Sequence, residues 1–175
     1  MNVAILGATG AVGREMMKIL AERSFPVEEL RLLASPRSAG QKLLWQGREL
    51  TVQPAEDSAF EGMDIVLGAA ENDIAKRFAP AIVKTGAVFV DNSSAFRMDP
   101  NVPPEINPED VRRHKGIIAN PNCTTIVSLV AINVLNQDSP IQSIIASSYQ
   151  AVSGAGASGP RELMEEVELL REGKP

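Results

Sequence analysis

Val3-Ala-Ile-Leu-Gly7-Ala-Thr-Gly10-Ala-Val-Gly13 is the stretch from which the fold of this chain can be predicted. Four apolar residues that end at a glycine indicate a short buried strand. From Ala11 the apolar residues recur at helical spacing, which predicts a helix to about Arg23. A strand, a glycine loop and a helix in this order are typical of an α/β domain with a parallel sheet.

The same alternation of apolar runs and helical segments continues to residue 119. Strands joined by helices in this way build a doubly wound parallel sheet, so we predict a Rossmann-type α/β domain over residues 1–120. The expected strands are 30–34, 64–68, 87–90 and 116–119, with a helix over 72–84 and a pair of inserted edge strands within 42–52.

The sequence pattern changes after residue 120. Residues 124–135 are apolar nearly all round, which predicts a buried helix. Residues 143–152 are rich in β-forming side chains, and residues 160–171 form a charged amphipathic pattern of helical period. A remainder of about fifty-five residues is near the lower size limit of an independent domain, so we interpret residues 121–175 as part of a second domain.

Composition excludes several classes of function. The net charge of −5 provides no basic field for nucleic acid, and no apolar run is long enough to cross a bilayer. A single cysteine and a single histidine rule out an internal disulfide and argue against a metal site built from these residues. The N-terminus lacks the basic start of a signal peptide. We therefore expect a cytoplasmic protein with no metal, membrane or nucleic-acid partner.

The glycine loop is the candidate cofactor site. Gly7, Gly10 and Gly13 follow the first strand and allow a tight turn, in which backbone N–H groups approach a pyrophosphate at the start of the helix. An ordinary turn that needs glycine for its backbone angles is the alternative. The position of the loop between strand and helix favours the dinucleotide interpretation.

The segment after the second strand indicates which dinucleotide is bound. An NAD site usually has an acid there for the ribose 2′-hydroxyl, whereas this chain has Ser35, Arg37 and Ser38. A guanidinium can bind a 2′-phosphate through two hydrogen bonds, and the serine hydroxyls can add further ones. This pattern favours NADP, with a solvated surface arginine as the alternative.

Cys123 is the candidate nucleophile. It lies in Asn120-Pro-Asn-Cys123, directly before the apolar helix, where the helix dipole and unpaired N–H groups favour a thiolate. A small buried apolar side chain is the alternative role of a lone cysteine. A sharp loop at the end of a sheet strand argues for the reactive role, since α/β sites form there.

Three further polar residues lie near these motifs or in the loops between strands. Arg97 follows the strand at 87–90 and is a candidate for binding an anionic substrate, with a surface arginine as the alternative. Gln150 precedes a glycine-rich turn and is a candidate for orienting a substrate carbonyl. His114 lies among Arg112, Arg113 and Lys115, so we interpret it as a solvated surface residue and not as a catalytic base.

Taken together, these segments resemble the aspartate-semialdehyde dehydrogenase family in order along the chain as far as about Gly159. The resemblance implies an NADP-binding Rossmann domain over 1–120 and, over 121–175, the beginning of an α+β catalytic and dimerisation domain. The motifs that resemble the family are Gly7–Gly13, Leu33–Gly40, Asp91–Arg97, Asn120–Cys123 and Ser148–Gly156.

The resemblance also implies roles for individual residues. Cys123 would form a thioester with the four-carbon substrate, and Gln150 would position that substrate. Arg97 would bind phosphate, and Asn122 would make a further contact with the substrate. The reaction would interconvert aspartate semialdehyde and aspartyl phosphate, with inorganic phosphate, in the biosynthesis of lysine, threonine, methionine and isoleucine. The residues that would contact NADP are Thr9, Gly10, Ala11, Val12, Arg37, Ser38, Ser153 and Gly154.

Several features depart from the family pattern or leave alternatives open. Members of the family continue for about as long again, and that half brings the acid–base histidine and a second substrate-binding arginine. The resemblance also implies a homodimer or homotetramer for the full-length enzyme. The segment Val102–Asn107 is shorter than in relatives, and Val127 stands where many have glutamine. N-acetyl-γ-glutamyl-phosphate reductase, which shares the fold and the thioester chemistry, and a non-catalytic NADP-binding regulatory module are the alternative functions.

Overall fold

The computed structural model describes residues 1–103, 108–156 and 158–174. Two compact units make up the chain, Met1–Leu129 and Val130–Pro175. The predicted boundary near residue 120 falls before the end of the first unit and stays a prediction. The segment Val102–Asn107, which is predicted to be shorter than in relatives, lies mostly outside the described residues.

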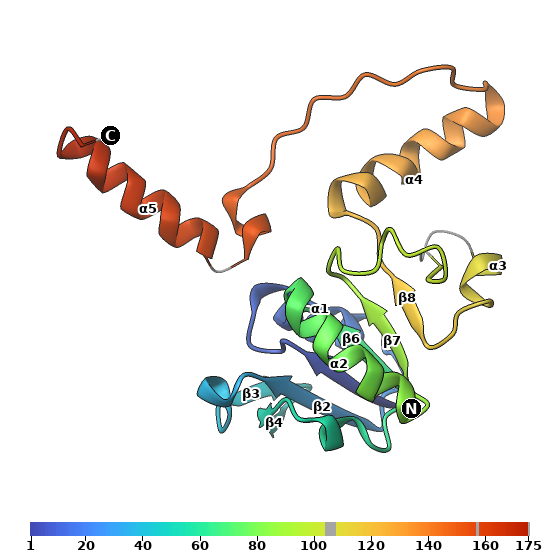
Figure 1. The fold of residues 1–175 in the computed structure, drawn as a ribbon, viewed down its shortest axis with the longest axis vertical. Helices are drawn as coiled ribbons and strands as arrows, with labels where there is room; N and C mark the ends of the chain where they lie inside the picture. The colour runs from blue at the N-terminus through green and yellow to red at the C-terminus, as the bar shows by residue number, and fades with distance from the viewer. Residues whose placement is uncertain (104–107, 157, 175) are drawn as a thin grey trace. The chain divides into compact units, whose positions relative to one another are not determined.

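A parallel sheet of six strands is the centre of the first unit (Figure 1). Every neighbouring pair in it is parallel, which confirms the Rossmann-type doubly wound fold. The order is β5-β2-β1-β6-β7-β8. These strands are β1 (Asn2–Leu6), β2 (Glu29–Ala34), β5 (Gln53–Pro54), β6 (Ile65–Gly68), β7 (Val88–Asp91) and β8 (Ile117–Ala119).

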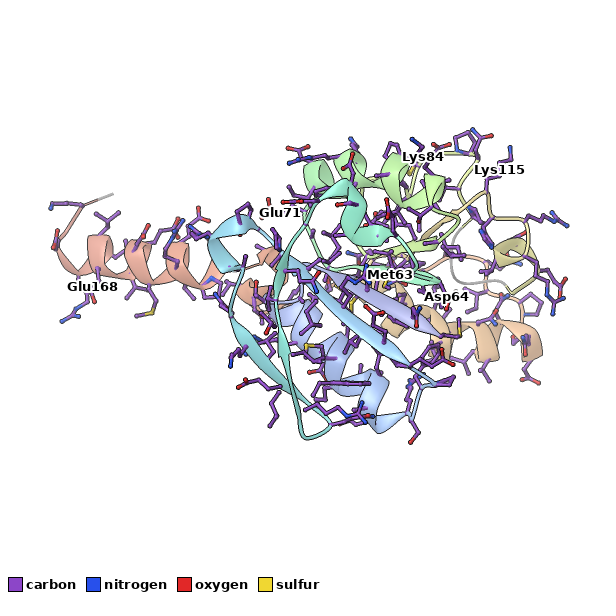
Figure 2. All side chains as sticks on the ribbon, turned by 90° about the horizontal axis from the view of Figure 1, so that it is seen from below. Met63, Asp64, Glu71, Lys84, Lys115 and Glu168 are labelled. Carbon is purple, nitrogen blue, oxygen red and sulfur yellow. The ribbon has the colours of Figure 1, made fainter. Side chains whose placement is uncertain are left out.

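Helices cover both faces of the sheet, as alternate residues of β1 show. Val3 and Ile5 belong to a core cluster with Met17 of α1 (Ala11–Glu22), whereas Ala4 and Leu6 belong to a second cluster with α2 (Asn72–Lys84). Side chains of a strand point alternately to opposite faces, so α1 and α2 lie on opposite sides. Glu71 and Lys84 mark the two ends of α2 in Figure 2, with charges that suit the helix dipole.

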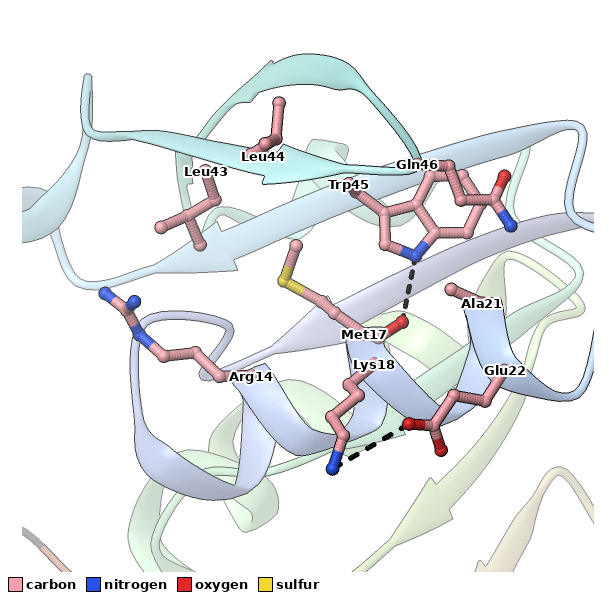
Figure 3. Close-up of a pocket in the computed structure, with 9 residues that line it drawn as sticks. All are labelled: Arg14, Met17, Lys18, Ala21, Glu22, Leu43, Leu44, Trp45 and Gln46. Atoms are coloured by element: carbon pink, nitrogen blue, oxygen red, sulfur yellow. Dashed lines mark hydrogen bonds and ion pairs between the residues drawn. The ribbon is translucent and has the colours of Figure 1, made fainter.

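The predicted edge strands within 42–52 exist, but they do not join the main sheet. β3 (Lys42–Trp45) and β4 (Arg48–Thr51) pair with each other as a separate antiparallel sheet, and β5 forms the edge of the parallel sheet instead. The Trp45 indole N–H donates a hydrogen bond of 2.9 Å to the carbonyl oxygen of Met17 (Figure 3). This tertiary bond fastens the hairpin to α1, so the hairpin needs no partner in the main sheet.

The prediction of β structure over 143–152 is wrong. This segment forms no strand, and Val152–Ala155 is the 3₁₀ helix η3, which leads toward α5 (Ser158–Arg171). A strand needs a neighbour to accept its backbone hydrogen bonds, and the described residues provide none for this segment. The predicted charged helix over 160–171 is confirmed by α5.

The helix predicted over 124–135 is confirmed as α4 (Cys123–Asp138), but its predicted burial is wrong. Val127, Val130 and Val134 of α4 are 76%, 69% and 65% exposed. An apolar run of this length is compatible with a helix, whereas burial requires a surface packed against it, and the residues that the structure describes do not cover this one. The remaining short elements are η1 (Pro36–Ser38), η2 (Asp57–Phe60) and α3 (Pro108–Val111).

Candidate functional site

The glycine loop lies where the sheet changes direction. The chain runs from β1 outward to β2 and β5, then returns to β6 on the other side of β1. Ligands of open α/β sheets bind in the crevice at the carboxyl ends of such strands. The predicted cofactor residues Gly7–Gly13 connect β1 to α1 at this position, which places them at the switch point of the sheet.

Close packing explains two of the three loop glycines. Gly7 has φ +92°, and a Cβ there would lie 2.6 Å from the carbonyl oxygen of Ala69, which follows β6. A Cβ on Gly13 would overlap the carbonyl oxygen of Gly7. Gly7 and Gly13 therefore allow strand, loop and helix to approach each other, as the third glycine of dinucleotide fingerprints does.

Gly10, the remaining glycine of the loop, is open to solvent. Gly10 is the N-cap residue of α1, and only one atom, the carbonyl oxygen of Gly7, would lie near a Cβ there, at 3.4 Å. Ala11 and Val12 are exposed beside it, Thr9 is half-buried, and the first turn of α1 contains no acidic residue. The first N–H groups of a helix lack intrahelical acceptors, so this exposed start of α1 suits an anionic group.

The predicted 2′-phosphate residues follow the strand next to β1. Leu6 of β1 pairs with Leu33 of β2, and the N–H of Gly7 donates to the carbonyl oxygen of Leu33 at 2.8 Å. The glycine loop and the end of β2 are thus adjacent. Ser35 and Arg37 are exposed directly after β2, and Ser38 is half-buried in η1.

Arg97 lies at the carboxyl ends of β7 and β8. Its Nε donates to the carbonyl oxygen of Asn120 at 2.9 Å, and its Nη2 donates to the carbonyl oxygen of Asn92 at 2.9 Å. The side-chain amide of Asn120 also donates to Oδ1 of Asn92. The Arg97 side chain is half-buried, and both acceptors of its hydrogen bonds are neutral carbonyl groups.

Asp91 is a buried acid that the sequence analysis did not assign. It ends β7 with 0% of its surface exposed, and its carboxylate accepts hydrogen bonds from the N–H and the hydroxyl of Ser93. Burial raises the pKa of Asp91, against the opposing effects of the Ser93 hydrogen bonds and the Arg97 charge. The available signal was an acid directly after the apolar run 87–90 and before the turn-forming residues Asn92-Ser93-Ser94.

The loop that contains Cys123 forms the start of α4, as predicted. Asn122 caps this helix, since its Oδ1 accepts the N–H groups of Thr124 and Thr125 at 3.0 and 3.3 Å. Cys123 is exposed at the first position of the helix, so its predicted alternative as a buried apolar side chain is wrong. Asn122 has a structural task beside its predicted contact with the substrate.

The remaining predicted residues belong to the second unit. Gln150 is exposed, and its side-chain amide lies against Gly154, where a Cβ would overlap it. Ser153 is exposed in η3, and the N–H of Gly154 donates to the carbonyl oxygen of Ala151 at 3.0 Å. The structure thus brings Gln150, Ser153 and Gly154 together on one turn.

His114 differs from its prediction as a solvated side chain. It is half-buried, and its Nδ1 accepts the N–H of Gly116 at 3.0 Å. This bond stabilises the turn before β8 and occupies one ring nitrogen. Within the described ranges, no group of three potential metal ligands occurs, and no helix there is long and apolar enough to cross a membrane.

A surface pocket of about 470 Å³ lies along α1 (Figure 3). It is bordered by α1 and β3, with Met17 and Trp45 in its wall. Lys18 at its rim is bonded to Glu15 at 3.0 Å and lies 3.8 Å from Glu22, and these neighbours raise the pKa of Lys18, mainly through the Glu15 hydrogen bond. None of its lining residues is a predicted site residue.

Comparison with known proteins identifies the family. Residues 2–114 match the model of the semialdehyde dehydrogenase NAD-binding domain. An aspartate-semialdehyde dehydrogenase of Synechocystis is 56% identical over 99% of this chain and 52% of its own length. The Bacillus subtilis aspartate-semialdehyde dehydrogenase is 46% identical over 97% of this chain and 50% of its own length. The chain thus spans about half the length of these relatives.

Solved structures agree with this similarity. Aspartate semialdehyde dehydrogenase II of Vibrio cholerae, complexed with ASA, has a TM-score of 0.90 at 42% identity, over 99% of this chain and 53% of that one. The Candida albicans enzyme with NADP shares the fold, with a TM-score of 0.63 at 24% identity over 80% of this chain and 48% of that one. From the family model, the sequence identities and the shared fold, we conclude that this chain belongs to the aspartate-semialdehyde dehydrogenase family.

Proposed function

We propose that this chain forms the cofactor-binding half and the nucleophile loop of an NADP-dependent aspartate-semialdehyde dehydrogenase. The observation that supports this most directly is the exposed Cys123 at the start of α4, three residues after the Asn120 carbonyl that binds Arg97. A nucleophile and an anion-binding cation near one sheet edge suit acyl transfer to phosphate. The curated relatives named above favour this function over a reductase of acetylglutamyl phosphate or a regulatory module.

The residues at the switch point fit a dinucleotide. The exposed start of α1 offers N–H groups to a pyrophosphate, and the close packing at Gly7 and Gly13 holds strand, loop and helix together around it. Thr9, Gly10, Ala11 and Val12 would hold the pyrophosphate, with Ser153 and Gly154 as further contacts. When bound, the nicotinamide ring supplies hydride transfer with the substrate carbon. The name of the matching family model and the NADP-bound Candida albicans structure support a nicotinamide dinucleotide.

We expect a preference for NADP over NAD, and Arg37→Asp should reduce NADP affinity. Arg37 is exposed at the end of β2, where an acid would bind the ribose of NAD. Each charge-assisted hydrogen bond to a phosphate is worth about 1.5–3 kcal/mol, so the loss should be about tenfold or more. Calorimetric titration of the chain with both cofactors measures this. Arg48→Asp, in the separate hairpin, is the matched control, and equal affinities of the unmodified chain for NADP and NAD would contradict the assignment.

Cys123 would act as the nucleophile. In the phosphorylating direction its thiolate would attack the aldehyde carbon of aspartate semialdehyde and form a hemithioacetal. This hemithioacetal would become an acyl-thioester when its hydride passes to NADP⁺ and its hydroxyl proton passes to the acid–base group assigned to the other half. Phosphate oxygen then attacks the thioester carbon, and the carbon–sulfur bond breaks to release aspartyl phosphate and the thiolate. The start of α4 favours the thiolate in both steps. Biosynthesis of lysine, threonine, methionine and isoleucine uses the reverse direction.

The other side chains would hold the substrates in place. Arg97 would offer N–H groups of Nη1 and Nη2 to the phosphate, because within the described residues its hydrogen bonds to Asn120 and Asn92 use Nε and one Nη2 hydrogen. Gln150 would orient the substrate carbonyl, and Asn122 would contact the substrate from the helix cap. Assembly as a homodimer or homotetramer and a cytoplasmic location are further parts of this proposal.

A chimera tests the proposed activity. We would replace the matched half of the Synechocystis relative with residues 1–175, which are 56% identical to it. We expect NADP- and phosphate-dependent oxidation of aspartate semialdehyde by the chimera. The 175-residue chain alone should be slower by at least about 10²-fold, since general acid–base catalysis contributes 10²–10⁴-fold and is assigned to the other half. A chimera that folds and binds NADP but remains inactive would contradict the proposal, as would full turnover by the chain alone.

A further inference from the structure

We propose that Asp91 is a positioning residue that orients the loop of Arg97 for anion binding. This inference deepens the proposed function and rests on it. The carboxylate of Asp91 is fully buried at the end of β7 and binds Ser93 twice, through N–H to Oδ1 at 3.2 Å and through the hydroxyl to Oδ2 at 2.6 Å. The Ser93 hydroxyl oxygen in turn accepts the N–H of Ala95 at 3.1 Å. The buried side chain of Asp91, through Ser93, thus fixes the path of the backbone as far as Ala95, two residues before Arg97.

The loop positioned by Asp91 also supplies part of the cradle of Arg97. The carbonyl oxygen of Asn92, the residue after Asp91, accepts Nη2 of Arg97, and the carbonyl oxygen of Asn120 accepts its Nε. Both carbonyls stand at the strand ends, and the N–H of Asn120 donates to the carbonyl oxygen of Asp91 at 2.8 Å. The loop therefore determines where the remaining guanidinium N–H groups point.

An aspartate suits this task better than the usual turn-forming residues. Ser93 donates two hydrogen bonds, to different oxygens of Asp91, and an asparagine side chain has one acceptor oxygen only. The neighbouring strand also leaves room for the carboxylate. Gly68 of β6 pairs with Asp91, and a Cβ on Gly68 would lie 3.0 Å from Oδ1 of Asp91. Burying a charge costs free energy unless it is well hydrogen-bonded, so this arrangement requires both donors.

A role of Asp91 through its charge and a role through positioning the loop predict opposite effects of Asp91→Asn on phosphate binding. Asp91 lies close enough to Arg97 for the charge of the arginine to lower the pKa of Asp91. Burial has the larger effect and raises the pKa of Asp91 overall. If Asp91 acted on the site by its charge alone, removal of that charge would strengthen the binding of a phosphate to Arg97. If Asp91 positions the loop, Asp91→Asn weakens phosphate binding, because the guanidinium loses its orientation.

The test is a titration of the ¹⁵N-labelled 175-residue chain with inorganic phosphate, followed at the Nε–H signal of Arg97. We expect phosphate to shift this signal, and Asp91→Asn to raise the dissociation constant about fivefold and to speed hydrogen exchange at Nε, as the loss of one hydrogen bond implies. Ser93→Ala should act in the same direction. Asp99→Asn is the matched control, because Asp99 is an exposed acid of the same loop.

The outcomes separate the two proposals. No shift of the Arg97 signal in the unmodified chain would contradict the anion site itself. A shift in the unmodified chain, with tighter or unchanged phosphate binding and unchanged exchange in Asp91→Asn, would overturn only the role of Asp91. If Asp91→Asn does not fold, Ser93→Ala decides the question by the same two measurements. NADP affinity should stay within about twofold in folded variants, since the cofactor loop follows a different strand.

Discussion

The Cys123→Ser variant of the chimera is expected to lose turnover by at least about a thousandfold while it binds NADP with unchanged affinity. A serine hydroxyl is a weak nucleophile unless a base activates it, and the dipole at the start of α4 favours a thiolate far more than an alkoxide. Initial rates of NADPH formation measure the loss, and calorimetry measures the affinity for NADP.

Ser128→Ala is the matched control for this prediction. Ser128 is an exposed residue of the same helix, so its replacement tests whether any small change in α4 reduces the rate. We expect the control to retain turnover within about twofold. Residual turnover of Cys123→Ser above about one tenth would contradict the thioester mechanism. A mass spectrum of the acylated chimera, with the adduct located outside Cys123, would contradict it as well.

The second large effect is expected at Gly7. Gly7→Ala places a Cβ 2.6 Å from the carbonyl oxygen of Ala69 at a φ of +92°, so the loop or β6 has to move. Left-handed backbone costs about 1–2 kcal/mol for a residue with a Cβ, and overpacking adds about 1–3 kcal/mol. We expect the free energy of unfolding to fall by about 2–5 kcal/mol in denaturant titrations of the chain, together with its affinity for NADP.

Gly10→Ala separates packing from cofactor binding in the same loop. Gly10 has φ −74°, and the nearest atom to an added Cβ is 3.4 Å away. We therefore expect stability to change by less than about 0.5 kcal/mol, whereas NADP affinity falls because the pyrophosphate approaches this exposed N-cap. Equal destabilisation by both substitutions would show that the loop is not packed as described. Unchanged NADP affinity in Gly10→Ala would contradict the cofactor site.

Local sequence patterns were sufficient for five of the six strands of the parallel sheet, whereas the edge strand β5 was not predicted. The apolar runs that end at Leu6, Ala34 and Gly68 became buried strands, and the helices at α1 and α2 begin where the apolar period changes. Residues at glycine loops and helix starts were also predictable, because backbone angles, caps and dipoles depend on neighbours in the chain. For that reason Gly7–Gly13 and Cys123 were placed correctly on their elements.

The sequence by itself therefore determined five strands of the doubly wound domain, its helices α1 and α2, and the local positions of its candidate residues. Only the tertiary structure decided that the hairpin 42–51 leaves the main sheet, that 143–152 forms no strand, and that two carbonyl groups bind Arg97. The reason is physical. Strand pairing, burial and the orientation of a long side chain depend on partners distant in sequence, such as Met17 for Trp45 and Asn120 for Arg97.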